Sequence, residues 1–330
     1  VTVAEVLKDA GYICGMFGKW GLGEPNTTGE PNSQGFDEWF GFLNQRHAHT
    51  HYPDYLWENR DTFYLKGNHE QRYQHTHELF TDRAVQFITE NKDTSFFLYL
   101  PYTLPHAEFA ATERFLDIYK DSSWTEREKT YAAMVTMVDD GLRQIMDALK
   151  TNGISDNTLL MFCSDNGAAD RYDGTFNSSG ELRGRKRDMY EGGIRTPMIA
   201  RWPDKITAGS RSDLVWYFPD VLPTFAELAG ANPPVNIDGI SIVPELLGEK
   251  MEAPERFLYW EFHEGAFYQA VRWKNWKGIR EGLEGMLELY KLETDISEKN
   301  DISDKHLDVV QVIKEYLEGA RTGSEYWKAY

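Results

Sequence analysis

The sequence is poor in cysteine, in positive charge and in long hydrophobic runs, and each shortage argues against a class of protein. Its 330 residues include two cysteines, Cys14 and Cys163, each within an apolar stretch. A disulfide framework is therefore not expected, and both residues are predicted to be buried free thiols. No apolar run approaches the roughly 18–20 residues that a membrane helix needs, so we predict no membrane span.

Positive charge is scarce, because 35 Lys and Arg face 53 Asp and Glu, which gives a net charge of −18. Proteins that bind nucleic acids neutralise phosphates with Lys and Arg, so this balance argues against a nucleic-acid partner. An anionic substrate would need local positive charge or a metal ion to offset the long-range repulsion.

Apolar residues are plentiful: 41% of the chain is hydrophobic and 14% aromatic, which is enough for a substantial core. The length suits one large domain, or one domain that carries a smaller one. The chain begins at Val1 rather than at Met, directly on a helix start. We therefore expect that an amino-terminal segment of the protein precedes it.

Helical and strand-like segments alternate along most of the chain. The strand-like segments are short and continuously apolar, as strands buried on both faces of a parallel sheet are. This alternation predicts an α/β fold with a mostly parallel sheet flanked by helices. The predicted helices cover residues 2–11, 80–88, 124–150 and 221–228, and the predicted strands cover 12–17, 95–100, 158–163 and 197–202.

The pattern changes after about residue 250, where aromatic-rich strands follow one another with short turns. We interpret this region as a small antiparallel sheet with one helix. The predicted domains are a catalytic α/β domain over residues 1–245 and an antiparallel subdomain over residues 246–330. Within the latter, strands are expected at 257–262, 267–273 and 286–292, and a polar helix at 305–317.

Three polar loops each follow directly on one of the three best predicted strands. They carry Lys19 after the first strand, His106 after the second, and Asp165 with Asn166 after the third. Because ligands of open α/β sheets bind at the carboxyl ends of the strands, we expect these side chains to converge. Carboxylate and amide oxygens suit Ca²⁺ or Mg²⁺, although Asn-Gly after an apolar run is also a common turn signal.

Two further segments are rich in histidine or in cationic side chains. Residues 46–51 hold three of the nine histidines, which favours recognition of a substrate or an anion; a polar surface loop is the alternative. Residues 181–197 are basic and close in sequence to Asp165, although a solvated basic loop has the same composition. The cations of this segment are Arg183, Arg185, Lys186, Arg187 and Arg195.

A series of motifs resembles those of the type I sulfatases in order and spacing. The resemblance covers essentially the whole chain, and within the family it is greatest to bacterial arylsulfatase-A-like enzymes that act on sulfated carbohydrates. The motifs occupy residues 17–23, 35–42, 104–106, 164–167, 182–193, 220–224, 238–241 and 289–301.

The resemblance implies an alkaline-phosphatase-like α/β domain with a smaller carboxy-terminal antiparallel subdomain. It also implies one Ca²⁺ ion, in preference to Mg²⁺, and a formylglycine made from Cys or Ser within a C/S-x-P-x-R motif. By motif match, Asp165 and Asn166 would be calcium ligands, and Lys19 would stabilise the formylglycine hydrate. His106 and Lys186 would hold the sulfate and assist departure of the leaving group.

The chain departs from the family pattern in three respects. It holds no C/S-x-P-x-R motif and lacks the amino-terminal Asp pair that also binds calcium; both would belong to the segment expected before Val1. Asp139 and Asp140 do not replace that pair, because adjacent residues of a helix diverge by about 100°. Gly21 stands where many relatives place a His. Whether His47, His49 or water takes over the role of that His is left open.

The leading hypothesis is a sulfuric ester hydrolase that removes sulfate from a sulfated carbohydrate or an aryl ester, with His47 and His49 binding the substrate. By resemblance the protein would be periplasmic or secreted. The alternatives are a phosphoester or phosphonate hydrolase of the same superfamily, and a non-catalytic sugar-binding derivative of the fold. Because the nucleophile motif is absent, we expect the 330 residues alone to be inactive.

Overall fold

The computed structural model describes residues 1–169, 175–249, 251 and 255–328. The chain forms two compact units, each with its own hydrophobic core. The first comprises Val1–Leu159 and Arg201–Met251, and the second comprises Leu160–Ala200 and Glu252–Tyr330. Within the described residues, no helix has the length and apolarity needed to cross a bilayer.

The first unit is built on a five-stranded sheet with the order β4-β3-β2-β1-β5. The three strands β2, β1 and β5 run parallel, while β3 and β4 add an antiparallel edge. The predicted strands at residues 12–17 and 95–100 are confirmed as β1 and β5, and the other three were not predicted. The strands are β1 (Ile13–Lys19), β2 (Glu38–Phe42), β3 (Tyr55–Glu58), β4 (Asp61–Tyr64) and β5 (Phe96–Tyr99).

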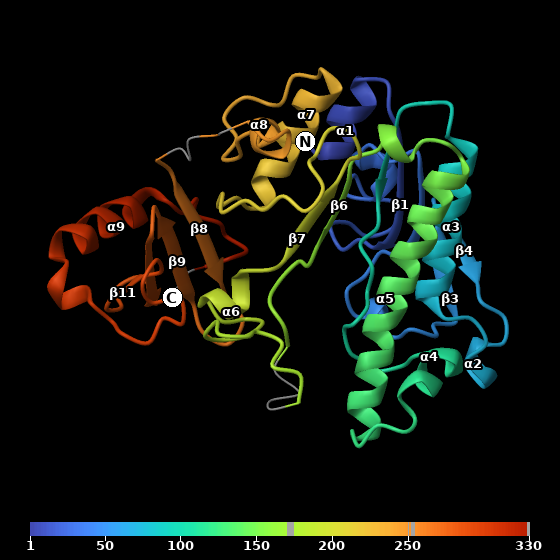
Figure 1. Cartoon of the computed structure of the whole chain (residues 1–330), viewed down its shortest axis with the longest axis horizontal. Helices are drawn as coiled ribbons and strands as arrows, with labels where there is room; N and C mark the ends of the chain where they lie inside the picture. The colour runs from blue at the N-terminus through green and yellow to red at the C-terminus, as the bar shows by residue number, and fades with distance from the viewer. Residues whose placement is uncertain (170–174, 250, 252–254, 329–330) are drawn as a thin grey trace. The chain divides into compact units, whose positions relative to one another are not determined.

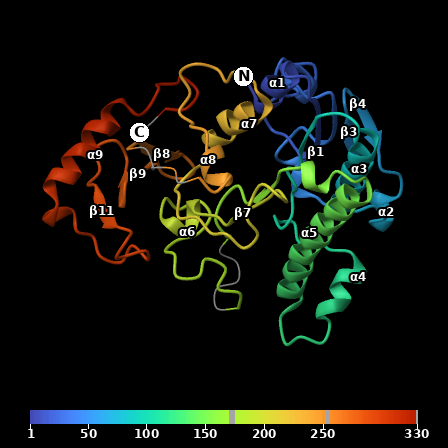
Figure 2. The ribbon, with the colours of Figure 1, turned by 45° about the horizontal axis from the view of Figure 1, so that its top comes forward.

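Helices cover both faces of this sheet. Phe96 packs against Phe87 of α3, whereas its neighbour Phe97 packs against Phe225 of α7. Because successive residues of a strand point to opposite faces, α3 and α7 lie on opposite sides. The long helix α5 runs beside α3 (Figure 1), and α1 lies beside α7 (Figure 2). The helices are α1 (Val3–Asp9), α2 (Asn68–Gln71), α3 (Thr76–Glu90), α4 (Glu113–Leu116), α5 (Glu126–Thr151), α7 (Val221–Ala229) and α8 (Val243–Leu246).

Local sequence signals explain where two of these helices begin. Thr2 caps α1 and Thr125 caps α5, and in each case a Glu three residues later completes a capping box. The predicted helices at 2–11, 80–88, 124–150 and 221–228 are thereby confirmed within a few residues.

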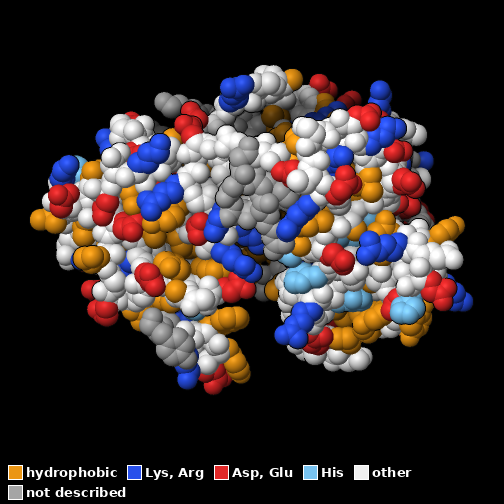
Figure 3. Space-filling model, turned by 90° about the horizontal axis from the view of Figure 1, so that it is seen from below, with side chains coloured by type: hydrophobic (Ala, Val, Ile, Leu, Met, Phe, Trp, Pro, Cys, Tyr) orange, Lys and Arg blue, Asp and Glu red, His pale blue; other side chains and the backbone are white. Residues whose placement is uncertain are grey.

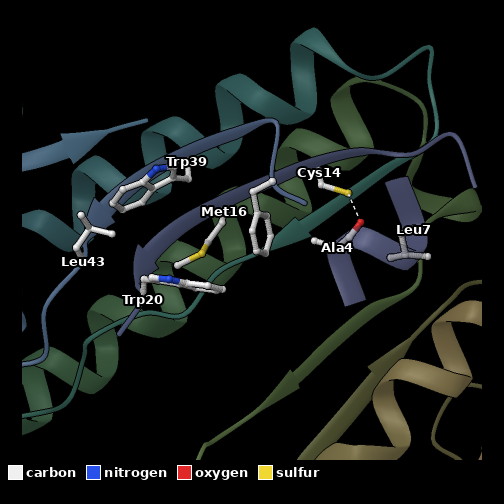
Figure 4. Close-up of a cluster of buried hydrophobic side chains, with 8 residues drawn as sticks. Ala4, Leu7, Cys14, Met16, Trp20, Trp39 and Leu43 are labelled. Atoms are coloured by element: carbon white, nitrogen blue, oxygen red, sulfur yellow. Dashed lines mark hydrogen bonds between the residues drawn. The ribbon is translucent and has the colours of Figure 1, made fainter. Parts of the chain in front are cut away.

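A buried cluster between α1 and the sheet forms part of the first unit's core (Figure 4). In it, the thiol of Cys14 is fully buried and lies 3.5 Å from the carbonyl oxygen of Ala4. Burial raises the pKa of the Cys14 thiol to about 12, so the prediction of a buried free thiol is confirmed for this residue. The thiol of Cys163 is also free but only half-buried.

The second unit contains a four-stranded antiparallel sheet with the order β11-β10-β9-β8, packed against α9. This confirms the predicted fold class, an α/β domain with helices around its sheet and a smaller antiparallel subdomain, although the described main sheet is mixed rather than mostly parallel. Residues 158–163 and 197–202, expected in the main sheet, instead form a separate pair, β6 with β7. The elements are β6 (Leu160–Cys163), α6 (Glu191–Ile194), β7 (Met198–Arg201), β8 (Phe257–Phe262), β9 (Tyr268–Trp273), β10 (Trp276–Glu281), β11 (Glu288–Lys291) and α9 (Leu307–Gly319).

The two compact units do not coincide with the two predicted domains. Residues 160–200, which the prediction placed in the α/β domain, group with the antiparallel sheet by their contacts. The boundary between residues 245 and 246 stays a prediction. Short 3-10 helices complete the described elements at Pro31–Gln34, His47–His49, Asp117–Tyr119, Ser155–Asn157, Phe218–Asp220 and Ser303–Lys305.

Candidate active site

Lys19 lies at the carboxyl end of β1, level with the end of β2 and three residues past the last β1 residue that pairs with β5. It is in register with Phe42, the last residue of β2, and its backbone N–H donates to the carbonyl of Pro101, just beyond β5, at 2.9 Å. A Cβ on Gly18 would stand 2.3 Å from that carbonyl oxygen, so glycine is required for this approach. The loops that follow β2, β1 and β5 therefore start from one edge of the sheet.

His106 is held in this edge by backbone and ring contacts. Its N–H donates to the carbonyl of Thr103 at 2.9 Å, and its ring stacks on that of His49, with centroids 4.9 Å apart. The Nδ1 atom of His106 lies 2.5 Å from the carbonyl oxygen of Ala107. A carbonyl can only accept, so Nδ1 of His106 carries a proton.

The histidines of residues 46–51 have different surroundings. His49 is exposed and contacts His106, whereas His47 is half-buried between the rings of Phe42 and Tyr55. Burial lowers the pKa of His47, which favours a neutral packing residue. Figure 3 shows histidine side chains gathered on this face of the first unit. The structure thus brings one of the two predicted substrate-binding histidines, His49, against the candidate His106.

Buried histidines behind this surface were missed by sequence reasoning. The Nε2 atom of His51 is 3.1 Å from the carbonyl oxygen of His106, and its ring stacks on that of His75 at 5.3 Å. Burial lowers the pKa of His51, so its ring is neutral and Nε2 donates to the carbonyl. The alternation of histidines at 47, 49 and 51 was the available signal, because the third member supports the loop that carries His106.

Gly21 has a positive φ of 125°, and a Cβ there would lie 2.7 Å from the side-chain nitrogen of Gln45. A histidine at this position would therefore be strained and would displace Gln45. A cavity of about 450 Å³ lined by residues 21–24 and 43–46 opens here. The position where many relatives place a His is thus occupied here by a glycine that lines this cavity.

In the second unit, the loop after β6 carries Asp165 and Asn166. The Ser164 hydroxyl donates to the carbonyl of Asn166 at 3.0 Å, and the N–H of Gly167 donates to the carbonyl of Gly193 at 2.8 Å. A Cβ on Gly167 would stand 1.8 Å from the carbonyl oxygen of Gly192. Only glycine allows this contact, so the metal-ligand candidates are fixed against the segment that contains Lys186.

Lys186 lies next to the metal-ligand candidates in the second unit. Its backbone N–H donates to the carbonyl of Ala168 at 2.9 Å, two residues beyond Asn166. The side chain of Lys186 is half-buried, whereas Asp165 is exposed. The structure therefore brings Lys186 close to the loop of Asp165 and Asn166 in this unit, and His49 against His106 in the first unit. The backbone of Lys19 contacts Pro101, at the start of the segment that leads to His106.

Several cations of the basic segment have structural partners. The Arg183 guanidinium lies 3.8 Å from the ring centroid of Tyr190 and donates to the Tyr290 hydroxyl at 3.1 Å and to the Glu298 carbonyl at 2.7 Å. Arg187 pairs with Glu264, and Arg195 pairs with Glu191. These contacts anchor the basic segment within the second unit.

A buried ion cluster anchors the same segment to β10. Lys277 is fully buried, with its Nζ 2.7 Å from Glu191 and 3.5 Å from Glu298. Burial favours the neutral acid, yet Lys277 holds the pKa of Glu191 below its usual range, whereas burial raises the pKa of Glu298. Sequence reasoning missed this lysine because β10 was not predicted; its inward position in an alternating strand was the only signal.

The residues present fit part of a calcium site. Asp165 and Asn166 supply a carboxylate and an amide oxygen, the hard donors that Ca²⁺ takes in sets of about six to eight. Among the described residues, no group of three or more His, Cys, Asp or Glu side chains is arranged to hold a metal ion. These two side chains could therefore be only part of a coordination shell.

The fold is that of the alkaline-phosphatase-like sulfatases, and comparison with known proteins supports this class. The sulfatase family profile matches residues 1–231, and the profile of the N-sulphoglucosamine sulphohydrolase carboxy-terminal region matches residues 184–322. The chain belongs to the sulfatase family.

The arylsulfatase of Hemicentrotus pulcherrimus is 31% identical over 79% of the chain and 48% of its own length. The N-acetylgalactosamine-6-sulfatase of Mus musculus is 35% identical over 76% of the chain and 49% of its own length. The crystal structure of Ps i-CgsB in complex with k-i-k-neocarrahexaose is 30% identical, with a TM-score of 0.82 over 96% of the chain and 73% of that protein. The chain thus spans about half the length of these curated relatives.

Proposed function

We propose that the protein carrying this chain hydrolyses sulfate esters of carbohydrates. The observation that carries the proposal is the convergence within each unit: Lys19 with the His106 loop at one sheet edge, and Lys186 beside Asp165 and Asn166. A sulfate ester carries negative charge on its oxygens, and cations with a metal ion offset that charge as the leaving oxygen departs. The similarity to an arylsulfatase and to an N-acetylgalactosamine-6-sulfatase supports sulfate rather than phosphate.

Each residue takes a role that its position allows. Asp165 and Asn166 would hold Ca²⁺, which when bound neutralises sulfuryl oxygens, and formylglycine would supply the nucleophile. Lys186 would bind a sulfate oxygen through its ammonium group. His106, held with Nδ1 donating to Ala107, would direct Nε2 to the ester; in its protonated form it would give a proton to the leaving oxygen.

The substrate class and compartment follow from the relatives. The complex of Ps i-CgsB with k-i-k-neocarrahexaose supports an oligosaccharide as the carrier of the sulfate ester. The resemblance to bacterial carbohydrate sulfatases supports a periplasmic or secreted location. Lys19 would hold the formylglycine in this scheme, and His49, stacked on His106, would contact the sugar.

The roles of Lys186 and His106 can be tested in the full-length protein by sulfate release from an aryl sulfate in the presence of Ca²⁺. We expect Lys186→Ala and His106→Ala each to lower kcat by about two to three orders of magnitude, the usual effect of removing one charge-stabilising group. The matched control is Lys314→Ala, an exposed lysine on α9, which should keep the wild-type rate. Wild-type rates in both site variants, with circular dichroism unchanged, would refute the assignment.

A further inference from the structure

A polar pocket in the first unit lies beside the His106 loop and is not used by any residue assigned to the sulfate. Its volume is about 440 Å³, within the range of small-ligand sites. Three segments form its walls: residues 50–54, residues 68–72, and residues 108–110.

Two residues that line the pocket connect it to His106, the candidate catalytic histidine, and to His49. His51 lines the pocket, and its Nε2 donates to the carbonyl of His106 at 3.1 Å. Glu108 also lines it, and the N–H of Glu108 donates to the carbonyl of His49, whose ring stacks on His106. An occupant of the pocket would therefore lie close to a group held by His106.

The floor of the pocket is preformed by a buried asparagine. Asn68 is 3% exposed, and its side-chain amide donates to the carbonyls of Pro53 at 3.0 Å and Gln74 at 2.9 Å. Its side-chain oxygen accepts from the N–H of Gln74 at 2.7 Å. The bond to Pro53 ties the second wall to the first, and the two bonds to Gln74 fix the Asn68 side chain, so little ordering is needed when a ligand binds.

The charge of the lining selects the ligand. The carboxylates of Asp54, Glu70 and Glu108 face one guanidinium, that of Arg72, which lies 3.7 Å from Glu108. His69 lies 3.6 Å from Asp54, and even a protonated His69 would leave the carboxylates in the majority. A sulfate would be repelled here, whereas sugar hydroxyls can donate to carboxylates and accept from a guanidinium.

We propose that this pocket is a subsite for an uncharged sugar residue adjacent to the sulfated one. The inference rests on the proposed sulfatase function and deepens it, because it states which neighbour the substrate carries. Tyr52 supplies an aromatic wall, and the carboxylates and Arg72 supply hydrogen-bond partners for hydroxyl groups. A second sulfate on the neighbouring sugar is disfavoured.

The test compares three substrates in the full-length enzyme. They are an aryl sulfate, the singly sulfated disaccharide that wild type desulfates fastest, and the same disaccharide with a second sulfate on the neighbouring sugar. Tyr52→Ala should lower kcat/KM for the singly sulfated disaccharide about tenfold and leave the aryl sulfate unchanged, since a tenfold loss corresponds to one good contact. Tyr73→Ala is the matched control, because Tyr73 is 76% exposed and does not line the pocket.

A second variant tests the charge argument without disturbing packing. Glu70→Gln should raise kcat/KM for the doubly sulfated disaccharide several-fold relative to the singly sulfated one, because Glu70 is exposed and contributes a charge to the lining. An unchanged ratio in Glu70→Gln, or a wild-type preference for the doubly sulfated substrate, would overturn the proposal.

The outcome for the aryl sulfate separates this proposal from the proposed function. If wild type releases no sulfate from any substrate, the sulfatase assignment fails. Binding of the unsulfated disaccharide, followed by NMR shifts in wild type and in Tyr52→Ala, then still decides whether the pocket holds a neutral sugar. Binding that Tyr52→Ala weakens supports the subsite, and equal or absent binding in both proteins overturns it.

Discussion

Two buried histidines make the first unit sensitive to acid. The Nδ1 atom of His75 accepts from the N–H of His77 at 3.1 Å, while its Nε2 donates to the carbonyl of Ala110 at 3.1 Å. The Nε2 atom of His77 donates to the carbonyl of Met137 at 2.8 Å, and its buried Nδ1 has no partner among the described residues. A proton on Nδ1 of His75 would face the N–H of His77, and a proton on Nδ1 of His77 would find no acceptor among the described residues, so both rings are held neutral.

Burial lowers the pKa of His75 from 6.5 to about 3 and that of His77 from 6.5 to about 4. Between these values and 6.5, the unfolded chain binds more protons than the folded one, so stability is complete above pH 6.5 and declines as the pH falls. Between pH 7 and pH 5 each ring costs about 2 kcal/mol, or about 4 kcal/mol together. This is a large fraction of the roughly 5–15 kcal/mol that stabilises a typical domain.

Urea unfolding at pH 7 and pH 5 measures this effect, with His75→Gln/His77→Gln as the comparison. The glutamines cannot titrate, so the loss of unfolding free energy between the two pH values should be about 4 kcal/mol smaller in the double variant. Other histidines and carboxylates contribute equally to both proteins and cancel in the difference. Equal losses in wild type and variant would refute the reasoning.

The second unit supports two further predictions. Lys277→Met leaves the buried carboxyl groups of Glu191 and Glu298 without their central cation, and we expect a loss of about 3–5 kcal/mol in urea unfolding; a change below 1 kcal/mol would contradict this. Gly167→Ala places a methyl group 1.8 Å from a carbonyl oxygen and should shift the Asp165–Asn166 loop, weakening Ca²⁺ binding measured by calorimetry. Gly319→Ala, where a Cβ meets no atom within 4 Å, is its control, and equal Ca²⁺ affinity in both variants would argue against this role of Gly167.

Local signals predicted most of the helices and several strands of the fold. The Thr2–Glu5 capping box marks the start of α1, and the aromatic run of β8 lies at residues 257–262 as expected. The strands that were missed, β2 to β4 and β10, are short or interrupted by glycine, and their stability comes from pairing with strands elsewhere in the chain. Pairing of this kind leaves little trace in a local pattern.

Residues of the candidate site could be predicted where a sequence motif marks them. They could not be predicted where they depend on partners far away in the sequence. Lys19 and His106 followed from loops after apolar strands, and β1 and β5 are indeed neighbours. His51 supports the His106 loop from 55 positions away in the sequence. Lys277 supports the basic segment through Glu191, from which it is 86 positions away. Three-dimensional proximity over such separations requires the fold, so these residues could not be assigned beforehand.

The central claim is that Lys186 beside the Asp165–Asn166 loop binds a sulfate ester in a calcium-dependent sulfatase. Its most direct test is the rate of sulfate release from an aryl sulfate by full-length wild-type protein and by Lys186→Ala, each at saturating Ca²⁺. The account predicts turnover by wild type and a rate about two to three orders of magnitude lower in the variant. Equal rates for the two proteins would contradict it. So would a wild type that hydrolyses an aryl phosphate but not the aryl sulfate.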